Sequence, residues 1–251
     1  MSQLSRLIIG VMALFLLVAC QKGLNDQEED RVAVRQRAKA AQYQTQLGLA
    51  YLKRGDRPLA KQKLVKALQL APKSAEAHVA MAYFLEKSDD MVRAKHYYQK
   101  ALSLAPKSGA QRNNYGTFLC RTGDYKQALP LLIQAGEDVH YPHSAMAYEN
   151  AGLCAELTHE EAKSMLYFKR AIAQDPARQV ALYELVKLLL KHHESKQALT
   201  TLQHHTVVVL NNPALLAVAI DAAKIEANSG AVAEYTQRLH HIQIGVNHEQ
   251  S

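Results

Sequence analysis

The residues of this chain with the most distinctive chemistry are its three cysteines and twelve histidines. Cys120 and Cys154 lie 34 residues apart, and the expected elements place each of them late in a helix. Two such cysteines either form a disulfide or remain as buried thiols. An exported chain meets an oxidising compartment, which favours the disulfide, but the spacing alone leaves both alternatives open.

The histidines are not spaced as metal ligands. His192-His193, His204-His205 and His240-His241 are adjacent pairs, and adjacent side chains on a helix point about 100° apart, so they do not easily share one ion. His140 and His143 are better spaced, but no cysteine or acidic cluster accompanies them. We therefore expect surface histidines and no metal site.

The sequence also lacks the fingerprints of common catalytic sites. It has no serine-hydrolase elbow, no phosphate-binding loop, no dinucleotide glycine motif and no H-E-x-x-H. We expect a protein that is not an enzyme and that needs no cofactor.

The elements that position these residues repeat every 34 residues. Leu47-Gly48, Tyr51, Gly55, Ala60, Leu64, Ala67 and Pro72 return as Met81-Ala82, Leu85, Asp89, Ala94, Tyr98, Ala101 and Pro106. A period of this length and form is typical of the tetratricopeptide repeat, a pair of antiparallel helices. Small residues such as Gly48 and Ala60 fall where the two helices should cross, and bulky Leu64 should fill the space between them.

The fold class that follows is all-α, a right-handed superhelix of about six tetratricopeptide repeats. The repeats should begin near residues 41, 75, 109, 145, 179 and 212 of a solenoid that spans 41–240. Repeats three and four are offset by 36 residues, which indicates a two-residue insertion between Gly136 and Pro142. Pro130 falls inside an expected helix and predicts a kink there. Residues 20–40 should form a tether and lead-in helix, and residues 241–251 a polar tail.

The amino terminus is typical of a secretory signal. Residues 1–19 begin with Arg6 as the positive charge and continue with an apolar run from Leu7 to Val18. The residues Leu17-Val18-Ala19-Cys20 resemble the lipobox of bacterial lipoproteins. That resemblance implies cleavage before Cys20, acylation of this cysteine, and stable attachment by its acyl chains. Gln21 follows where the inner-membrane retention signal has Asp, which implies the periplasmic face of the outer membrane.

The chain is basic, with a formal charge of +7. Removal of residues 1–19 takes away Arg6 alone, which leaves 29 Lys and Arg against 23 Asp and Glu, or +6. The basic residues are expected to be scattered among acidic ones over the helix faces. We interpret them as solvated surface with modest attraction to a membrane, and we expect no nucleic-acid partner.

A solenoid of this kind binds other proteins on the concave face lined by its first helices. Counting positions within each repeat, and adding the adjacent asparagines Asn114 and Asn150, gives the candidate groove residues Thr45, Leu49, Val79, Tyr83, Asn113, Asn114, Thr117, Arg121, Glu149, Asn150 and Leu153. Leu157 holds the last groove position of repeat four. The mixture of apolar, amide and hydroxyl groups suits an extended peptide, a strand or a partner helix, and the alternative is a solvated groove without a ligand.

Two central segments indicate which family of tetratricopeptide-repeat proteins this chain resembles. Residues 113–120, NNYGTFLC, and residues 148–154, YENAGLC, resemble the PilF/PilW type IV pilus biogenesis family, as do the lipobox and the six repeats. The resemblance implies a pilotin, an outer-membrane lipoprotein that helps to localise or assemble the secretin multimer. It also implies that Cys120 and Cys154 are the family's paired cysteines.

Two functions therefore remain. The first is a monomeric pilotin that binds subunits of the type IV pilus secretin. The alternative is another envelope scaffold on lipidated repeats, for outer-membrane protein assembly or the regulation of cell-wall synthesis. Loss of the secretin multimer on deletion favours the first, and normal pili with an envelope defect favour the second.

Overall fold

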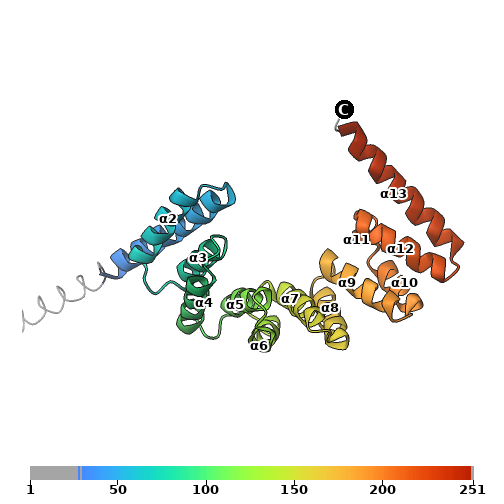
Figure 1. Ribbon diagram of the computed structural model, residues 1–251. Helices are drawn as coiled ribbons and strands as arrows, with labels where there is room; N and C mark the ends of the chain where they lie inside the picture. The colour runs from blue at the N-terminus through green and yellow to red at the C-terminus, as the bar shows by residue number, and fades with distance from the viewer. Residues whose placement is uncertain (1–27, 29, 250–251) are drawn as a thin grey trace, which may run out of the picture. The chain divides into compact units, whose positions relative to one another are not determined.

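The computed structural model describes residue 28 and residues 30–249, in which every regular element is a helix (Figure 1). The expected signal sequence, the lipobox and Cys20 lie outside the described residues. By its internal contacts the chain divides into two compact units, Met1–Leu104 and Ala105–Ser251. The all-α fold class is confirmed.

The first unit contains two helical hairpins. A helix over residues 30–53 is followed by α2 (Arg57–Leu70), α3 (Ala75–Glu86) and α4 (Met91–Leu104). The expected lead-in helix is therefore continuous with the first helix of repeat one. Asp56 and Ser74 cap α2 and α3, because their side chains accept hydrogen bonds from the backbone N–H groups of Leu59 and Ala77.

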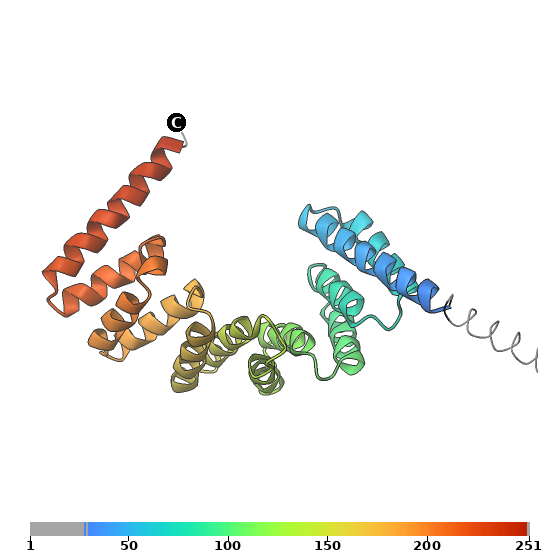
Figure 2. The same ribbon diagram turned by 180° about the vertical axis from the view of Figure 1, so that it is seen from behind.

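The second unit contains the remaining hairpins. They are formed by α5 (Gly109–Arg121) with α6 (Tyr125–Gly136), α7 (Ser144–Leu157) with α8 (Glu161–Gln174), α9 (Gln179–Lys191) with α10 (Ser195–His204), and α12 (Pro213–Ile225) with α13 (Ser229–Glu249). A short helix, α11 (Thr206–Val209), precedes α12. Within this unit α7 packs against both α5 and α8, so its core is built from successive hairpins, which Figure 2 shows from behind.

Small residues allow the paired helices to approach closely. A Cβ atom added to Gly48 would lie 2.6 Å from Leu64 Cγ, and one added to Gly152 would lie 2.5 Å from Phe168 Cε1. Both distances are too short for a side chain, as the small-against-large pattern predicts. In the α7–α8 hairpin Ser164 replaces the usual alanine, and its hydroxyl donates to the Gly152 carbonyl at 2.9 Å.

The turn within each hairpin uses a left-handed backbone. The residues concerned are Gly55, Asp89, Gly123, His159, His193 and Ala227, with φ between 51° and 85°. They follow each other at intervals of 34 residues, except for 36 between Gly123 and His159. The same repeat position therefore reverses the chain in every hairpin, whether or not glycine occupies it.

Two regions differ from a regular repeat. Helix α6 continues through Pro130, and a seven-residue connection, 137–143, separates it from α7. At the carboxyl end, α13 continues to Glu249, so residues 241–249 of the expected polar tail are helical.

Candidate functional site

The candidate groove residues of the first unit differ in exposure. Thr45 is buried, and its hydroxyl donates to the Ala41 carbonyl at 2.9 Å within the same helix. Leu49 and Tyr83 are 37% and 39% exposed, and Val79 is half-buried. The Lys87 ammonium lies 5.4 Å from the centre of the Tyr83 ring, a cation–π contact. Leu49 and Tyr83 are therefore the accessible apolar members of this set.

In the second unit, three candidate residues form one polar cluster between α5 and α7. The Asn150 side-chain amide donates to Asn113 Oδ1 at 2.9 Å and to Thr117 Oγ1 at 3.3 Å. The Thr117 hydroxyl donates in turn to the Asn113 carbonyl at 2.7 Å. Asn113 is only 3% exposed, whereas Thr117 and Asn150 are half-buried. The cluster fixes the orientation of the two helices and presents its outer members at the surface.

Glu149 joins α7 to the start of α9. Its carboxylate forms a bidentate ion pair with Arg178, in which the Nε–Oε2 distance is 3.2 Å, and it accepts a hydrogen bond from the Ala181 backbone N–H at 3.0 Å. That N–H belongs to the first turn of α9, where a negative charge is favourable. Glu149 is 6% exposed, and Arg178 satisfies its buried charge. Reasoning from repeat positions placed Glu149 in the groove and missed Arg178.

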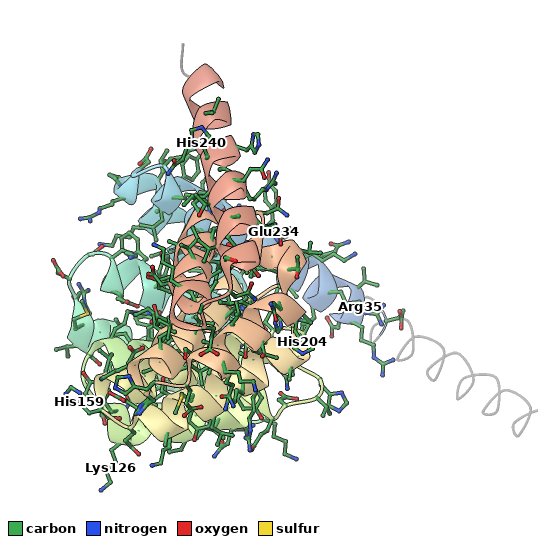
Figure 3. The ribbon with its side chains drawn as sticks, turned by 90° about the vertical axis from the view of Figure 1, so that its right-hand side faces the viewer. Arg35, Lys126, His159, His204, Glu234 and His240 are labelled. Carbon is green, nitrogen blue, oxygen red and sulfur yellow. A yellow bond between two sulfur atoms is a disulfide. The ribbon has the colours of Figure 1, made fainter. Side chains whose placement is uncertain are left out.

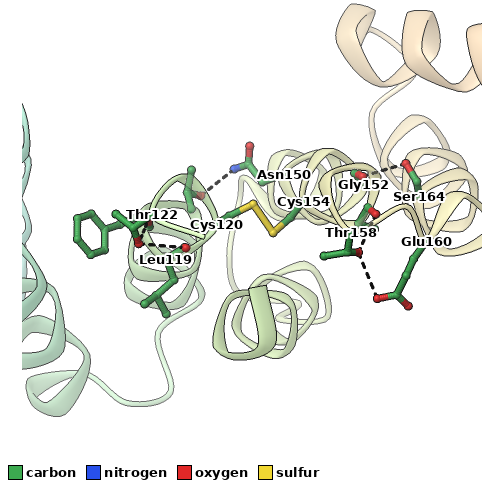
Figure 4. Close-up of a disulfide and its surroundings, with 12 residues drawn as sticks. Leu119, Cys120, Thr122, Asn150, Gly152, Cys154, Thr158, Glu160 and Ser164 are labelled. Carbon is green, nitrogen blue, oxygen red and sulfur yellow. Dashed lines mark hydrogen bonds between the residues drawn. A yellow bond between two sulfur atoms is a disulfide. The ribbon is translucent and has the colours of Figure 1, made fainter. Parts of the chain in front are cut away.

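A disulfide joins the same pair of helices. Cys120 and Cys154 are bridged, with their Cα atoms 5.8 Å apart, and both residues are buried (Figure 4). The bridge lies next to Asn150, so a covalent link and a hydrogen-bonded cluster together hold α5 against α7.

The start of α5 is fixed by the loop that precedes α7. Asp138 Oδ2 accepts a hydrogen bond from the Gly109 N–H at 2.8 Å, and a Cβ atom on Gly109 would lie 2.7 Å from Tyr141 Cβ. Hydrogen bonds from the backbone N–H groups of His140 and then Gly109 hold the pKa of Asp138 below its ordinary value. Burial raises the pKa of the Tyr141 hydroxyl, against the opposing effect of a hydrogen bond with Asn113.

The accessible surface that results is here named the α5–α7 face. It consists of Asn114, Thr117, Arg121, Asn150, Leu153 and Leu157. Arg121 is exposed, Leu157 is 56% exposed, and Asn114 and Leu153 are half-buried. Amide, hydroxyl, guanidinium and apolar groups on two rigidly joined helices suit recognition of another protein.

Among residue 28 and residues 30–249, no helix is long and apolar enough to cross a membrane. The same described residues contain no group of three or more histidine, cysteine or acidic side chains that could hold a metal ion.

Comparison with known proteins first identifies the broad class of protein to which this chain belongs. The model of the tetratricopeptide repeat family matches residues 45–109 and 119–178. Together with the helical hairpins and their turns, this match makes the chain a tetratricopeptide-repeat protein.

More specific relatives define the family. The solved structure of PilF from Pseudomonas aeruginosa superposes with a TM-score of 0.69 at 30% identity, and it covers 83% of this chain and 94% of that one. The structure of PilW, a type IV pilus biogenesis factor, gives a TM-score of 0.63 at 26% identity, with 80% and 92% covered. This chain belongs to the family of the type IV pilus assembly proteins PilF and PilW.

Curated sequences agree with this assignment. The type IV pilus assembly protein PilF of Pseudomonas aeruginosa is 31% identical over 149 residues, 59% of this chain and 59% of that protein, so the match spans less than two thirds of its length. An uncharacterised protein of Haemophilus influenzae is 31% identical over 159 residues, 62% of this chain and 83% of that protein. The predicted family is thereby confirmed.

Proposed function

We propose that this protein is an outer-membrane lipoprotein pilotin, anchored through Cys20 at the periplasmic face, that assembles or localises the type IV pilus secretin. Membership of the PilF/PilW family carries this proposal, because its named members act in type IV pilus assembly. The lipobox at residues 17–20 supports the anchor.

The α5–α7 face supports a binding role. Its two helices are held by a disulfide and a polar cluster, so little conformational freedom is lost when a partner binds. Secretin subunits expose strand edges and apolar surface before they assemble, and such surfaces need protection. We assign that protection to the α5–α7 face, with exposed Leu157 as a principal apolar contact.

Two matched leucines test this assignment. Leu157 lies on the first helix of its hairpin and Leu166 on the second, and they are 56% and 45% exposed. A charge at a central apolar contact weakens binding by roughly tenfold or more, whereas a charge outside the interface has little effect. We therefore expect Leu157→Glu to reduce the amount of secretin that copurifies with this protein and Leu166→Glu to leave it unchanged.

Both variants should unfold at the temperature of the parent protein, since neither leucine belongs to the core. If Leu157→Glu and the parent protein capture equal amounts of secretin, the α5–α7 face is not the surface that binds it.

A further inference from the structure

The positive charge of this chain is concentrated in its first helical hairpin. Residues 31–74 contain eleven Lys and Arg but a single acidic residue, Asp56. Residues 75–251 contain 17 basic and 18 acidic residues, so they are close to neutral. The expectation that basic residues are scattered among acidic ones over the helix faces is therefore wrong for this hairpin.

The structure leaves these charges at the surface. Ten of the eleven basic residues are exposed, and Lys63 is half-buried. In the described part of the chain, Arg31 alone among them pairs with a carboxylate, that of Glu28 at 3.9 Å, and both side chains are well exposed. Figure 3 shows Arg35 extending from the first helix into solvent. Almost the whole charge of the hairpin thus remains available to an outside anion.

Apolar side chains accompany the cations at the start of the first helix. Val32 is 41% exposed and Tyr43 is 60% exposed, and helical spacing places both on the same side of the helix as Arg35 and Lys39. Exposed aliphatic and tyrosine side chains beside Lys and Arg are typical of helices that lie at a membrane surface. A purely soluble polyanion would contact the cations but offer these apolar groups no partner.

Helix α2 adds a hollow suited to phosphate. Its volume is about 600 Å³, and its lining includes Lys61, Lys63 and Lys66 together with Gln44 of the first helix. Ammonium groups are strong donors to phosphate oxygens. A phospholipid headgroup matches both the charge of this hollow and the mixed surface of residues 31–43.

We propose that the first hairpin binds the phosphate headgroups of an anionic bilayer, independently of acylation. The choice of a bilayer rests on the proposed attachment at Cys20, which lies ten residues before Asp30. Ten residues reach at most roughly 35 Å, so the anchor keeps the basic hairpin close to the membrane. Electrostatic attraction then adds a second attachment signal to the acyl chains.

Sedimentation with phospholipid vesicles tests this proposal on a protein that lacks the acylated cysteine. Every helix and contact described above lies within residues 28–249, so a chain that begins at Gln21 retains them. We expect it to bind vesicles of phosphatidylcholine mixed with phosphatidylglycerol, to bind phosphatidylcholine alone much less, and to be released by salt. Free inorganic phosphate, added as a competitor, should not release it.

Two triple variants with the same change in net charge separate the hairpin from overall charge. Arg31→Gln, Arg35→Gln and Arg37→Gln together should lower partitioning into anionic vesicles by roughly 100-fold, since each basic side chain near such a surface contributes about fivefold. Lys100→Gln, Lys126→Gln and Lys196→Gln together should change it little, because these exposed lysines lie outside residues 31–74.

Equal losses in the two triple variants, or no binding to anionic vesicles by the parent chain, would overturn the proposal and leave an acidic protein as the partner to seek. Release by free phosphate would assign the hollow to a soluble anion instead of a bilayer. Secretin capture is measured separately, so failure here is distinguishable from failure of the pilotin proposal.

Discussion

At the scale of single residues, the turn position of each hairpin imposes a cost wherever it is not glycine. Ala227, between α12 and α13, has φ of 51°, a region in which a Cβ atom approaches the following carbonyl. Gly55 and Gly123 occupy the equivalent position without that contact. The backbone strain at Ala227 therefore arises because the repeat requires the chain to reverse direction at this residue.

Relief of this strain is measurable. Ala227→Gly should raise the free energy of unfolding by about 0.5–1 kcal/mol, because 1–2 kcal/mol of left-handed strain outweighs the added entropy of the unfolded chain. Ala233→Gly, at an exposed position within α13, is the matched control and should lower the free energy by about 1 kcal/mol. Urea unfolding followed by circular dichroism distinguishes the two. A destabilised Ala227→Gly protein would contradict the account of the turn.

Residue types alone predict the fold far better than the accessible site. Gly48 and Leu64 mark the helix crossing because close packing requires a small residue opposite a large one. Nothing local marks Glu149 as buried, since its partner Arg178 lies 29 residues away on the next hairpin. Asn113 is hidden for the same reason, because Asn150 reaches it from α7. The position of a residue within the repeat predicts the direction in which its side chain points. Packing against neighbouring repeats then determines whether that side chain remains exposed.

At the scale of elements, the pairing of α5 with α7 is held by both a covalent bond and side-chain hydrogen bonds. It combines the Cys120–Cys154 disulfide with the hydrogen bonds of Asn150. The disulfide closes a loop of 34 residues, and such a cross-link restricts the unfolded chain. The α5–α7 face therefore depends on an oxidising compartment for its full stability.

Chemical reduction of the Cys120–Cys154 disulfide tests this dependence. We expect a reducing agent to lower the free energy of unfolding of the parent protein by about 3–4 kcal/mol, the magnitude for a loop of this length. The double variant Cys120→Ala/Cys154→Ala serves as the control, and its urea midpoint should not respond to the reductant. A parent protein whose midpoint is the same with and without reductant would show that the bridge contributes no stability.

At the scale of the whole molecule, two separate parts of the sequence carry the two proposed interactions. The basic residues 31–74 belong to the first unit, and the α5–α7 face belongs to the second. Variants in one part should leave the function of the other intact, because the two sets of residues belong to different compact units. Acylation at Cys20 and attraction through the first hairpin would fix the protein at a membrane, while the later repeats remain free to hold a partner.

The most direct test of this account is the state of the secretin in cells that lack the gene. Membranes are run on a gel without boiling and probed for the heat-stable secretin multimer, with the parent gene or Cys20→Ala returned on a plasmid. We predict that deletion leaves monomeric or mislocalised secretin, that the parent gene restores the outer-membrane multimer, and that Cys20→Ala restores it poorly because the protein is no longer anchored. An unchanged outer-membrane multimer in the deletion strain would contradict the pilotin function and favour another envelope scaffold.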